Sequence, residues 1–197
     1  MPYLRSTTRT NRQERIADAA MRCIARTGFA NTTMADIIEE SGLSAGSIYS
    51  HFTGKVDLVR FASASALARD QIDFEQELQT RRPYPTPVQV VSYFLSQAFA
   101  QSERKVVLHI WAESLADPEL AVIVRASTER FRDSIAATIT PWALARSADS
   151  SAAERLASST AEALLVLIHG YYVQVGIGYP PNPDHTVRLI EDAFSDS

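Results

Sequence analysis

Residues 33–52 carry two helix-start signals separated by a glycine, and this arrangement limits the possible folds more than any other part of the sequence. Thr33 is suited to cap a helix through its hydroxyl, and Asp36, three residues later, completes a capping box. Gly42 tolerates a positive φ and therefore suits a tight turn, and Ser44 supplies a second helix cap directly after it. We therefore predict two short helices joined by a tight turn.

Apolar residues at helical spacing supply the inner faces of both helices. In the second helix, predicted over residues 44–52, Ile48 and Phe52 are four residues apart and lie on one side. The apolar residues of the first helix and the turn are Met34, Ile37, Ile38 and Leu43. The opposite side of the second helix carries only small or hydrogen-bonding residues, namely Ala45, Gly46, Ser47, Tyr49, Ser50 and His51.

This outward side of residues 44–52 fits a groove of DNA. Small side chains let the backbone approach closely, and the exposed first turn of a helix offers N–H donors to phosphate. Ala45 is suited to contact a thymine methyl group and Ser47 a base edge, whereas Tyr49 and His51 are suited to reach phosphates. Taken alone, the segment is also compatible with an ordinary corner between two helices that has a serine-rich surface.

Charge is distributed unevenly along the chain of 197 residues, whose net charge is −4. Residues 1–60 contain eight Lys and Arg and six Asp and Glu, whereas the remainder contains 11 basic and 17 acidic residues. The first twelve residues carry Arg5, Arg9 and Arg12 and no acidic residue. Taken alone, this segment is most simply interpreted as a solubilising tail. Because residues 33–52 also fit DNA, we expect it to be a basic arm that binds DNA.

Helical periodicity dominates the whole sequence, and no β-type alternation of useful length occurs. Three prolines between residues 80 and 87 indicate a loop. The predicted fold class is all-α, with an N-terminal three-helix helix-turn-helix domain over residues 1–54 and a helical C-terminal domain over residues 55–197. The predicted helices span about residues 11–27, 33–40, 44–52, 55–79, 87–102, 104–116, 117–143, 151–177 and 183–195.

The segment from Arg15 to Val59 resembles the DNA-binding domain of the TetR (tetracycline-repressor-like) family of bacterial regulators. The residues that carry the resemblance are Arg15-Ile-Ala-Asp-Ala-Ala, Gly28-Phe29, Thr32-Thr33, Ala35-Asp36-Ile37, Ser41-Gly-Leu-Ser44, Gly46-Ser47-Ile48-Tyr49, His51-Phe52, Lys55 and Leu58. The resemblance implies that residues 44–50 form the recognition helix. It also implies that the phosphate backbone is held by Thr33, Tyr49, His51 and Lys55.

The recognition helix departs from the family pattern at Ala45, where many members carry a basic residue. Without Arg or Lys in this helix, the strong bidentate contact to guanine is missing. We therefore expect readout by small contacts, by DNA shape and by the arginine arm in a minor groove. The predicted DNA-binding residues are Arg5, Arg9, Arg12, Thr33, Ser44, Ala45, Gly46, Ser47, Tyr49, His51 and Lys55.

The C-terminal part of TetR proteins holds a ligand pocket and a dimer interface. The run from Trp111 to Leu120 is similar to the C-terminal region of members related to the choline-responsive repressors. Helix 151–177 is apolar on nearly all sides and helix 183–195 has an apolar stripe, so we expect both to join a second copy in a four-helix bundle. The alternative is a core helix within one chain. The predicted dimer contacts are Leu164, Ile168, Tyr171, Val187, Ile190 and Phe194.

Aromatic residues with a few polar groups on apolar helices are typical of small-molecule sites. The predicted pocket residues are Phe94, His109, Trp111, Phe131, His169 and Tyr172. For each residue taken singly, a core aromatic with a satisfied polar tip is the alternative. The sequence predicts no cofactor and no metal site, because His109 and Glu113 are only two ligands four residues apart.

The single cysteine, Cys23, lies on an apolar helix face and is expected to be inert. A lone thiol and the lack of an apolar leader favour the cytoplasm and no membrane partner. Together these features predict a dimeric repressor that binds a palindromic operator and is released by a small molecule, with helix 55–79 linking the two domains. The alternatives are an activator of the same fold, a helical adaptor, and an enzyme using His109 and Glu113 or His169.

Overall fold

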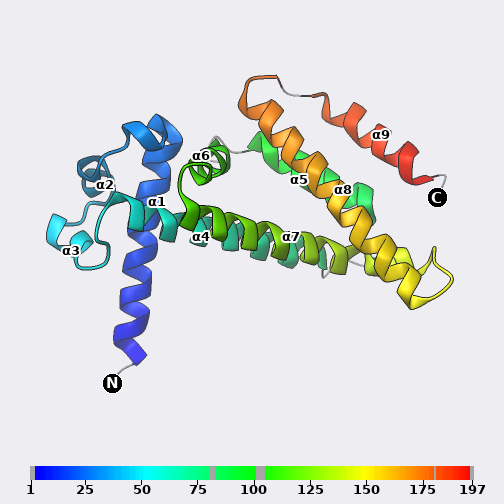
Figure 1. Ribbon diagram of the computed structural model, residues 1–197, viewed down its shortest axis with the longest axis horizontal. Helices are drawn as coiled ribbons and strands as arrows, with labels where there is room; N and C mark the ends of the chain where they lie inside the picture. The colour runs from blue at the N-terminus through cyan, green and yellow to red at the C-terminus, as the bar shows by residue number, and fades with distance from the viewer. Residues whose placement is uncertain (1–2, 80–82, 101–104, 180, 196–197) are drawn as a thin grey trace. The chain divides into compact units, whose positions relative to one another are not determined.

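The computed structural model describes residues 3–79, 83–100, 105–179 and 181–195 (Figure 1), and for residues 3–10, 79, 97–100, 105 and 193–195 it describes the backbone only. The fold is all-α, as predicted. The elements are α1 (Tyr3–Asn31), α2 (Met34–Ser41), α3 (Ala45–Tyr49), α4 (Lys55–Phe74), a π-helical turn η1 (Glu75–Gln79), α5 (Pro87–Ala100), α6 (Lys105–Ser114), α7 (Pro118–Leu144), α8 (Ser150–Gly176) and α9 (Pro183–Ser195).

Helix α1 differs most from its predicted bounds. It begins at Tyr3, so Arg5 and Arg9 lie in a helix and not in an extended arm. The physical reason is that residues 3–27 contain no glycine or proline that would interrupt helical hydrogen bonding. Gly28 ends the regular part of α1 as predicted, because its φ of 78° lies in the left-handed region that glycine favours.

The first compact unit comprises the described residues up to Arg69 together with 105–125. Helix α1 packs against both α2 and α6, and its buried residues contribute to two apolar clusters. One cluster joins Ile16, Ala20 and Cys23 to Ile37, Ile48, Phe52 and Leu58. The other joins Ala17, Met21 and Ile24 to Val59, Ala62, Ile110 and Leu120. The first cluster supports α2 and α3 from behind, and the second attaches α6 and the start of α7.

Asp117 fixes the start of α7 within this unit. One of its carboxylate oxygens accepts the N–H groups of Glu119 and Leu120, at 3.0 and 3.2 Å. The same carboxylate binds Arg60 on α4 through two hydrogen bonds of 2.8 Å. The Arg60 guanidinium holds the pKa of Asp117 below its ordinary value.

The second compact unit comprises the described residues 70–100 and 126–195. Helix α5 packs against both α8 and α9 (Figure 1). Four aromatic rings form the centre of its core: Phe74 lies 5.3 Å from both Phe94 and Phe131 between ring centroids, and 6.0 Å from Tyr93. Helices α4 and α7 contribute residues to both units. The compact units therefore differ from the predicted domains, whose boundary after Gly54 stays a prediction.

Candidate nucleic-acid interface

The predicted capping box at the start of α2 is present. The Thr33 hydroxyl oxygen accepts the backbone N–H of Asp36 at 3.2 Å, and the Asp36 carboxylate accepts the backbone N–H of Thr33 at 2.7 Å. The Thr33 hydroxyl also donates to this carboxylate at 2.7 Å. These bonds lower the pKa of Asp36. The start of α2 is therefore fixed by its own first turn, as the sequence predicts.

The turn between α2 and α3 also follows the sequence signals. Gly42 has φ 64° and ψ 20°, a left-handed conformation that costs glycine little. The Ser44 hydroxyl accepts the N–H of Ser47 at 3.3 Å and caps α3. Helix α3 ends at Tyr49, earlier than predicted. Beyond it, the His51 N–H donates to the Ile48 carbonyl oxygen at 2.9 Å, and this bond to the third residue before it forms a tighter turn than an α-helix.

Helix α3 has one buried and one exposed side. Ile48 and Phe52 are buried at 0% and 3% exposure in the cluster behind the helix. The exposed residues are Ser44, Ala45, Gly46, Tyr49 and Ser50, with Ser47 half-buried between them. No Lys, Arg, Asp or Glu occurs on this side, so α3 presents a neutral, low-relief surface that admits close approach of a large partner.

Polar atoms of His51 and Thr33 are partly engaged or covered within the first unit, and their phosphate-binding role stays a prediction. The Thr33 hydroxyl already donates to Asp36. His51 is half-buried, and its Nδ1 atom is buried without a hydrogen-bond partner in the described part of the chain. Tyr49 is 53% exposed and remains accessible.

Lys55 has contacts that the resemblance did not predict. Its Nζ donates to the backbone oxygens of Phe29 and Thr32, each at 2.9 Å, and lies 4.3 Å from the centroid of the Phe29 ring. Lys55 is half-buried, and two of its three N–H donors are occupied within the protein. In this structure Lys55 is therefore tied to the joint between α1 and α2.

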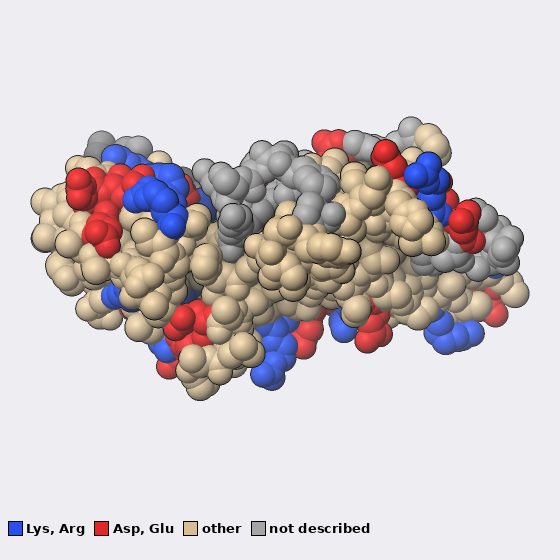
Figure 2. Space-filling model, turned by 90° about the horizontal axis from the view of Figure 1, so that it is seen from above, with Lys and Arg blue, Asp and Glu red and all other residues tan. Residues whose placement is uncertain are grey.

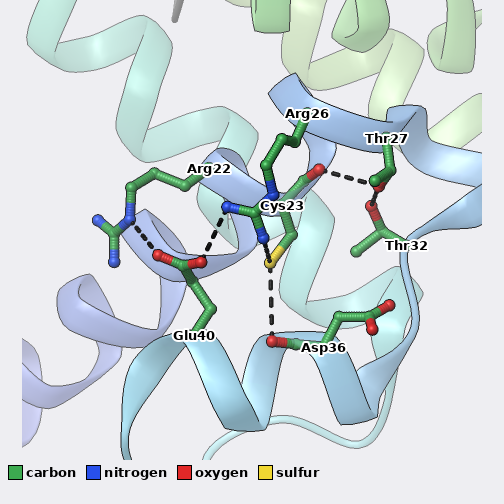
Figure 3. Close-up of polar contacts among 7 residues, drawn as sticks. All are labelled: Arg22, Cys23, Arg26, Thr27, Thr32, Asp36 and Glu40. Carbon is green, nitrogen blue, oxygen red and sulfur yellow. Dashed lines mark hydrogen bonds and ion pairs between the residues drawn. The ribbon is translucent and has the colours of Figure 1, made fainter.

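A second group of polar contacts ties α2 to α1 (Figure 3). Glu40 on α2 binds Arg22 Nε at 2.8 Å and Arg26 Nη1 at 2.9 Å. Both arginines hold the pKa of Glu40 below its ordinary value. The buried Cys23 thiol points to the Asp36 carbonyl oxygen at 3.7 Å, and burial raises its pKa. Sequence reasoning missed this clamp, although Arg22 and Arg26 are four residues apart and share a helix face.

Several basic residues of the first unit form ion pairs within it. Three of them, Arg22, Arg26 and Arg60, belong to the eight counted in residues 1–60, and Arg60 binds Asp117. Arg69 binds Asp18 at 2.7 Å. On the face drawn in Figure 2, basic side chains lie beside acidic ones and form no continuous basic field. Arg12 is exposed on α1. The side chains of Arg5 and Arg9 lie outside the described residues.

The six predicted pocket residues fall into two groups. His109 and Trp111 lie on α6 in the first unit, and a Cβ atom at Gly28 would be only 3.5 Å from the His109 ring. Phe94, Phe131, His169 and Tyr172 lie in the second unit. The two rings Phe94 and Phe131 belong to its aromatic core, and burial lowers the pKa of His169.

The predicted dimer contacts are mostly buried within one chain. Leu164, Ile168, Tyr171 and Ile190 lie in the chain's own core at 1% to 4% exposure. Val187 is half-buried against the same core. The side chain of Phe194 lies outside the described residues. The physical reason is that α5 packs against α8 and α9 and covers this side of both helices.

The exposed side of α8 carries a different apolar stripe. Val166, Val173 and Ile177 are 69%, 43% and 73% exposed, and Ala163 and Gly170 are also exposed. These five positions alternate in steps of three and four residues, which is the spacing of a helix–helix seam. Leu189 on α9 is 56% exposed. The exposed stripe of α8 lies on the side opposite to the predicted contacts on this helix, and the dimer interface stays a prediction.

Potential metal ligands are scattered over the described ranges, where no three His, Cys, Asp or Glu side chains come close enough together to hold a metal ion. Among the described helices, none combines the length and the apolar character needed to cross a bilayer.

Comparison with known proteins gives two family matches. Residues 16–61 match the model for bacterial regulatory proteins of the tetR family. Residues 88–196, more than half of the chain, match the model for the C-terminal part of BetI-type transcriptional repressors. Together the two models cover most of both compact units.

Similar proteins are transcriptional regulators. The chain is 47% identical over 45 residues to the regulator TtgR of Pseudomonas putida, which is 23% of this chain and 21% of that protein. It is 29% identical over 76 residues to SrpR of Pseudomonas putida, which is 39% of this chain and 36% of that protein. The matches thus span well under half of either relative.

A solved structure matches over nearly the whole chain. It is a transcriptional regulator from Saccharomonospora viridis in complex with choline, with a TM-score of 0.70 and 24% identity over 93% of this chain and 95% of that one. At this identity the likeness concerns the fold.

Proposed function

This chain belongs to the TetR family of DNA-binding transcriptional regulators, and on that premise we propose that it is a repressor which binds a palindromic operator as a dimer and releases it when a small molecule binds. We propose that the exposed side of α3 enters the major groove. The observation that carries this proposal is the contrast within α3 between the buried Ile48 and the exposed tip from Ser44 to Gly46.

The properties of this tip support direct contact with DNA. Its side chains are small, and Ser44 to Gly46 form the exposed N-terminal turn of α3. Such a surface suits phosphate and base edges, and it lacks the charges that usually cover a solvated helix. Without Arg or Lys on α3, we propose that sequence readout depends on small contacts and DNA shape.

The test uses duplexes selected by the wild-type protein from a random-sequence pool. Ala45→Glu adds a carboxylate to an exposed position in the first turn of α3, where it does not disturb the fold. We expect it to weaken binding of a selected duplex by about 100-fold or more, because it opposes phosphate charge. Val122→Glu makes the same charge change on α7, at a side chain that is 61% exposed, and serves as the matched control. Equal losses in both variants would contradict the assignment of α3.

We propose that a second copy covers the stripe formed by Val166, Gly170, Val173 and Ile177, together with Leu189. Large exposed apolar side chains in a row are unfavourable in water and are typical of an interface. Gly170 would let a second helix come close, because it has no side chain and no atom of its own chain covers it within 4 Å of an added Cβ. A two-fold dimer of this kind would present two copies of α3 to two half-sites about one helical turn apart or slightly more.

Gly170→Ala tests the close approach. Within one chain, alanine is expected to stabilise α8 by about 1 kcal/mol. At a tight two-fold seam, the two added methyl groups would instead weaken self-association, which sedimentation velocity over a dilution series measures. A variant that is more stable and associates at least as well as wild type would contradict close packing at Gly170.

The effector site is proposed in the second unit, around Phe94, Phe131, His169 and Tyr172. Aromatic rings and a few polar groups suit an organic cation, because ring faces attract positive charge. The choline complex of the Saccharomonospora viridis protein makes choline the first compound to test. We expect a concentration-dependent rise in Tm and loss of operator binding. DNA affinity that stays the same with every compound that raises Tm would contradict ligand-dependent release.

Three alternatives differ in measurable ways. An activator of the same fold would bind the same DNA and raise transcription from a reporter. A helical adaptor would not show DNA affinity that falls steeply with salt. An enzyme using His109 and Glu113 or His169 is disfavoured, since the similar proteins named above are all regulators. We place the protein in the cytoplasm with its operator.

A further inference from the structure

The carboxylate of Glu75 lies beside the aromatic core of the second unit and has no part in the proposed function so far. Glu75 directly follows Phe74, the last residue of α4, whose ring is at the centre of that core. It accepts a hydrogen bond from Ser134 on α7, which is three residues after Phe131 and shares its helix face. The Phe74 and Phe131 rings are themselves in contact, with centroids 5.3 Å apart. Both helices therefore place the carboxylate at the edge of the aromatic core.

Both hydrogen bonds of this carboxylate end on the same oxygen. Gln71 Nε2 and Ser134 Oγ each donate to Glu75 Oε1 at 2.8 Å. These partners carry no charge, and in the part of the chain that the structure describes no ion pair with Lys or Arg reaches the half-buried Glu75. A carboxylate that is partly removed from water without a cationic partner is unfavourable for the fold. A bound cation would offset this cost.

The backbone at Glu75 is a second observation that points to a ligand. The regular α-helix ends at Phe74, and the π-helical turn Glu75–Gln79 begins at the carboxylate itself. Such turns are rare and are frequently found at functional sites. The change of helix type therefore occurs at the residue that carries the unbalanced charge.

The aromatic core supplies the other component of a site for an organic cation. Tyr93 and Phe131 are half-buried, so each ring keeps part of its surface outside the core. Ring faces attract positive charge, but they also bind a neutral molecule of the same shape through apolar contact. A carboxylate beside the rings strongly favours the charged molecule over the neutral one.

We propose that Glu75 is the counter-ion of the effector site, and that its carboxylate binds the positive charge of an organic ammonium ion packed against Phe131 and Tyr93. This inference rests on the effector site proposed in the second unit, and it names the residue that selects for charge there. Gln71 and Ser134 position the carboxylate by holding Oε1, and Oε2 faces the ammonium group. The residues already proposed for this site include no acidic side chain, so charge selection depends on Glu75.

Glu75→Gln tests the charge, because the glutamine oxygen accepts the same two hydrogen bonds and the side chain keeps its size. The probes are choline, the ligand of the Saccharomonospora viridis structure, and its neutral isostere, in which a tert-butyl group replaces the trimethylammonium group. Isothermal titration calorimetry measures both affinities. We expect the wild-type protein to bind choline at least about ten-fold more tightly than the isostere, and Glu75→Gln to lose most of this preference.

Two control variants separate the counter-ion role from other effects. Glu77→Gln makes the same charge change at an exposed residue of the same π-helical turn, and should keep the preference for choline. Ser134→Ala removes one hydrogen bond from Glu75 and keeps the carboxylate, so it should lower Tm and also keep the preference. Circular dichroism without any compound confirms that each variant is folded.

Three results would overturn the proposal. Equal losses of preference in Glu75→Gln and Glu77→Gln would show that net charge alone sets the preference. An unchanged preference in Glu75→Gln would show that Glu75 only joins η1 to α7. A wild-type protein that binds the isostere as tightly as choline, or binds neither, would show that Glu75 forms no cation site. Binding of a selected duplex by the wild-type protein without any compound is measured separately, and only its failure would contradict the proposed DNA-binding function.

Discussion

Two alanine substitutions only two residues apart on α8 should affect different properties of the protein. Ile168 is 1% exposed in the core of the second unit, whereas Val166 is 69% exposed on the opposite side of the helix. Replacing Ile168 by alanine leaves a cavity, and we expect it to lower the free energy of unfolding by about 2–5 kcal/mol. Replacing Val166 removes two methyl groups that together are worth about 1.6 kcal/mol when fully buried.

The exposed fraction of Val166 decides how much of this value of about 1.6 kcal/mol is lost in folding and how much in association. Since only about a third of the side chain is covered in one chain, folding loses about 0.5 kcal/mol, which the higher helix propensity of alanine largely offsets. The remaining part, about 1 kcal/mol for each chain, is lost only when a second copy covers the residue. Two chains then lose about 2 kcal/mol, or about 30-fold in the dimer dissociation constant.

Urea unfolding at a protein concentration well below the dimer dissociation constant measures the first property, and sedimentation equilibrium over a dilution series measures the second. We expect Val166→Ala to weaken the dimer with little change in the stability of each chain. If Val166→Ala lowers the unfolding free energy as much as Ile168→Ala, the assigned sides of α8 are incorrect. If neither variant changes self-association, the stripe is not the dimer interface.

Three further changes test other contacts. Thr33→Ala removes the hydroxyl that accepts the Asp36 N–H, and should lower the free energy of unfolding by about 1 kcal/mol in urea titrations; an unchanged midpoint would refute the cap. Arg22 and Arg26 lower the pKa of Glu40, so its carboxylate stabilises the fold above its ordinary pKa near 4.3, and this stabilisation is lost as the pH falls through the folded value. Glu40→Gln should therefore lower Tm at pH 7 and have little effect near pH 3, and an equal drop at both pH values would count against the ion pairs. Burial lowers the pKa of His169, so the unfolded chain takes up the proton first and stability should fall between pH 7 and pH 5; His169→Gln should flatten that fall, and a variant with the wild-type pH profile would show that another group causes it.

Local signals in the sequence were sufficient for the helix-turn-helix. Thr33, Gly42 and Ser44 act on backbone groups within three residues, and all three do in the structure what their positions predicted. Glycine and proline marked most helix ends for the same reason. Helix α1 was the exception, because its early start depends on the absence of a breaker.

Several charged side chains of the first unit bind partners that are far away in the sequence. Arg22 binds Glu40, 18 residues later, and Lys55 binds backbone oxygens 23 and 26 residues earlier. Neither pairing has a local signal, so sequence reasoning gave Arg22 no role and assigned Lys55 to the phosphate backbone. Only the packing of α2 and α4 on α1 shows these contacts within the protein.

The same distinction applies to α8. The sequence by itself determined that this segment is a helix, that it is apolar on nearly all sides, and that more than one of its sides therefore has to be covered. It did not determine which side meets the chain's own core, because Leu164 and Val166 are equally apolar. The tertiary structure decided this, since α5 packs against one side and buries Leu164 and Ile168, leaving Val166 and Val173 exposed.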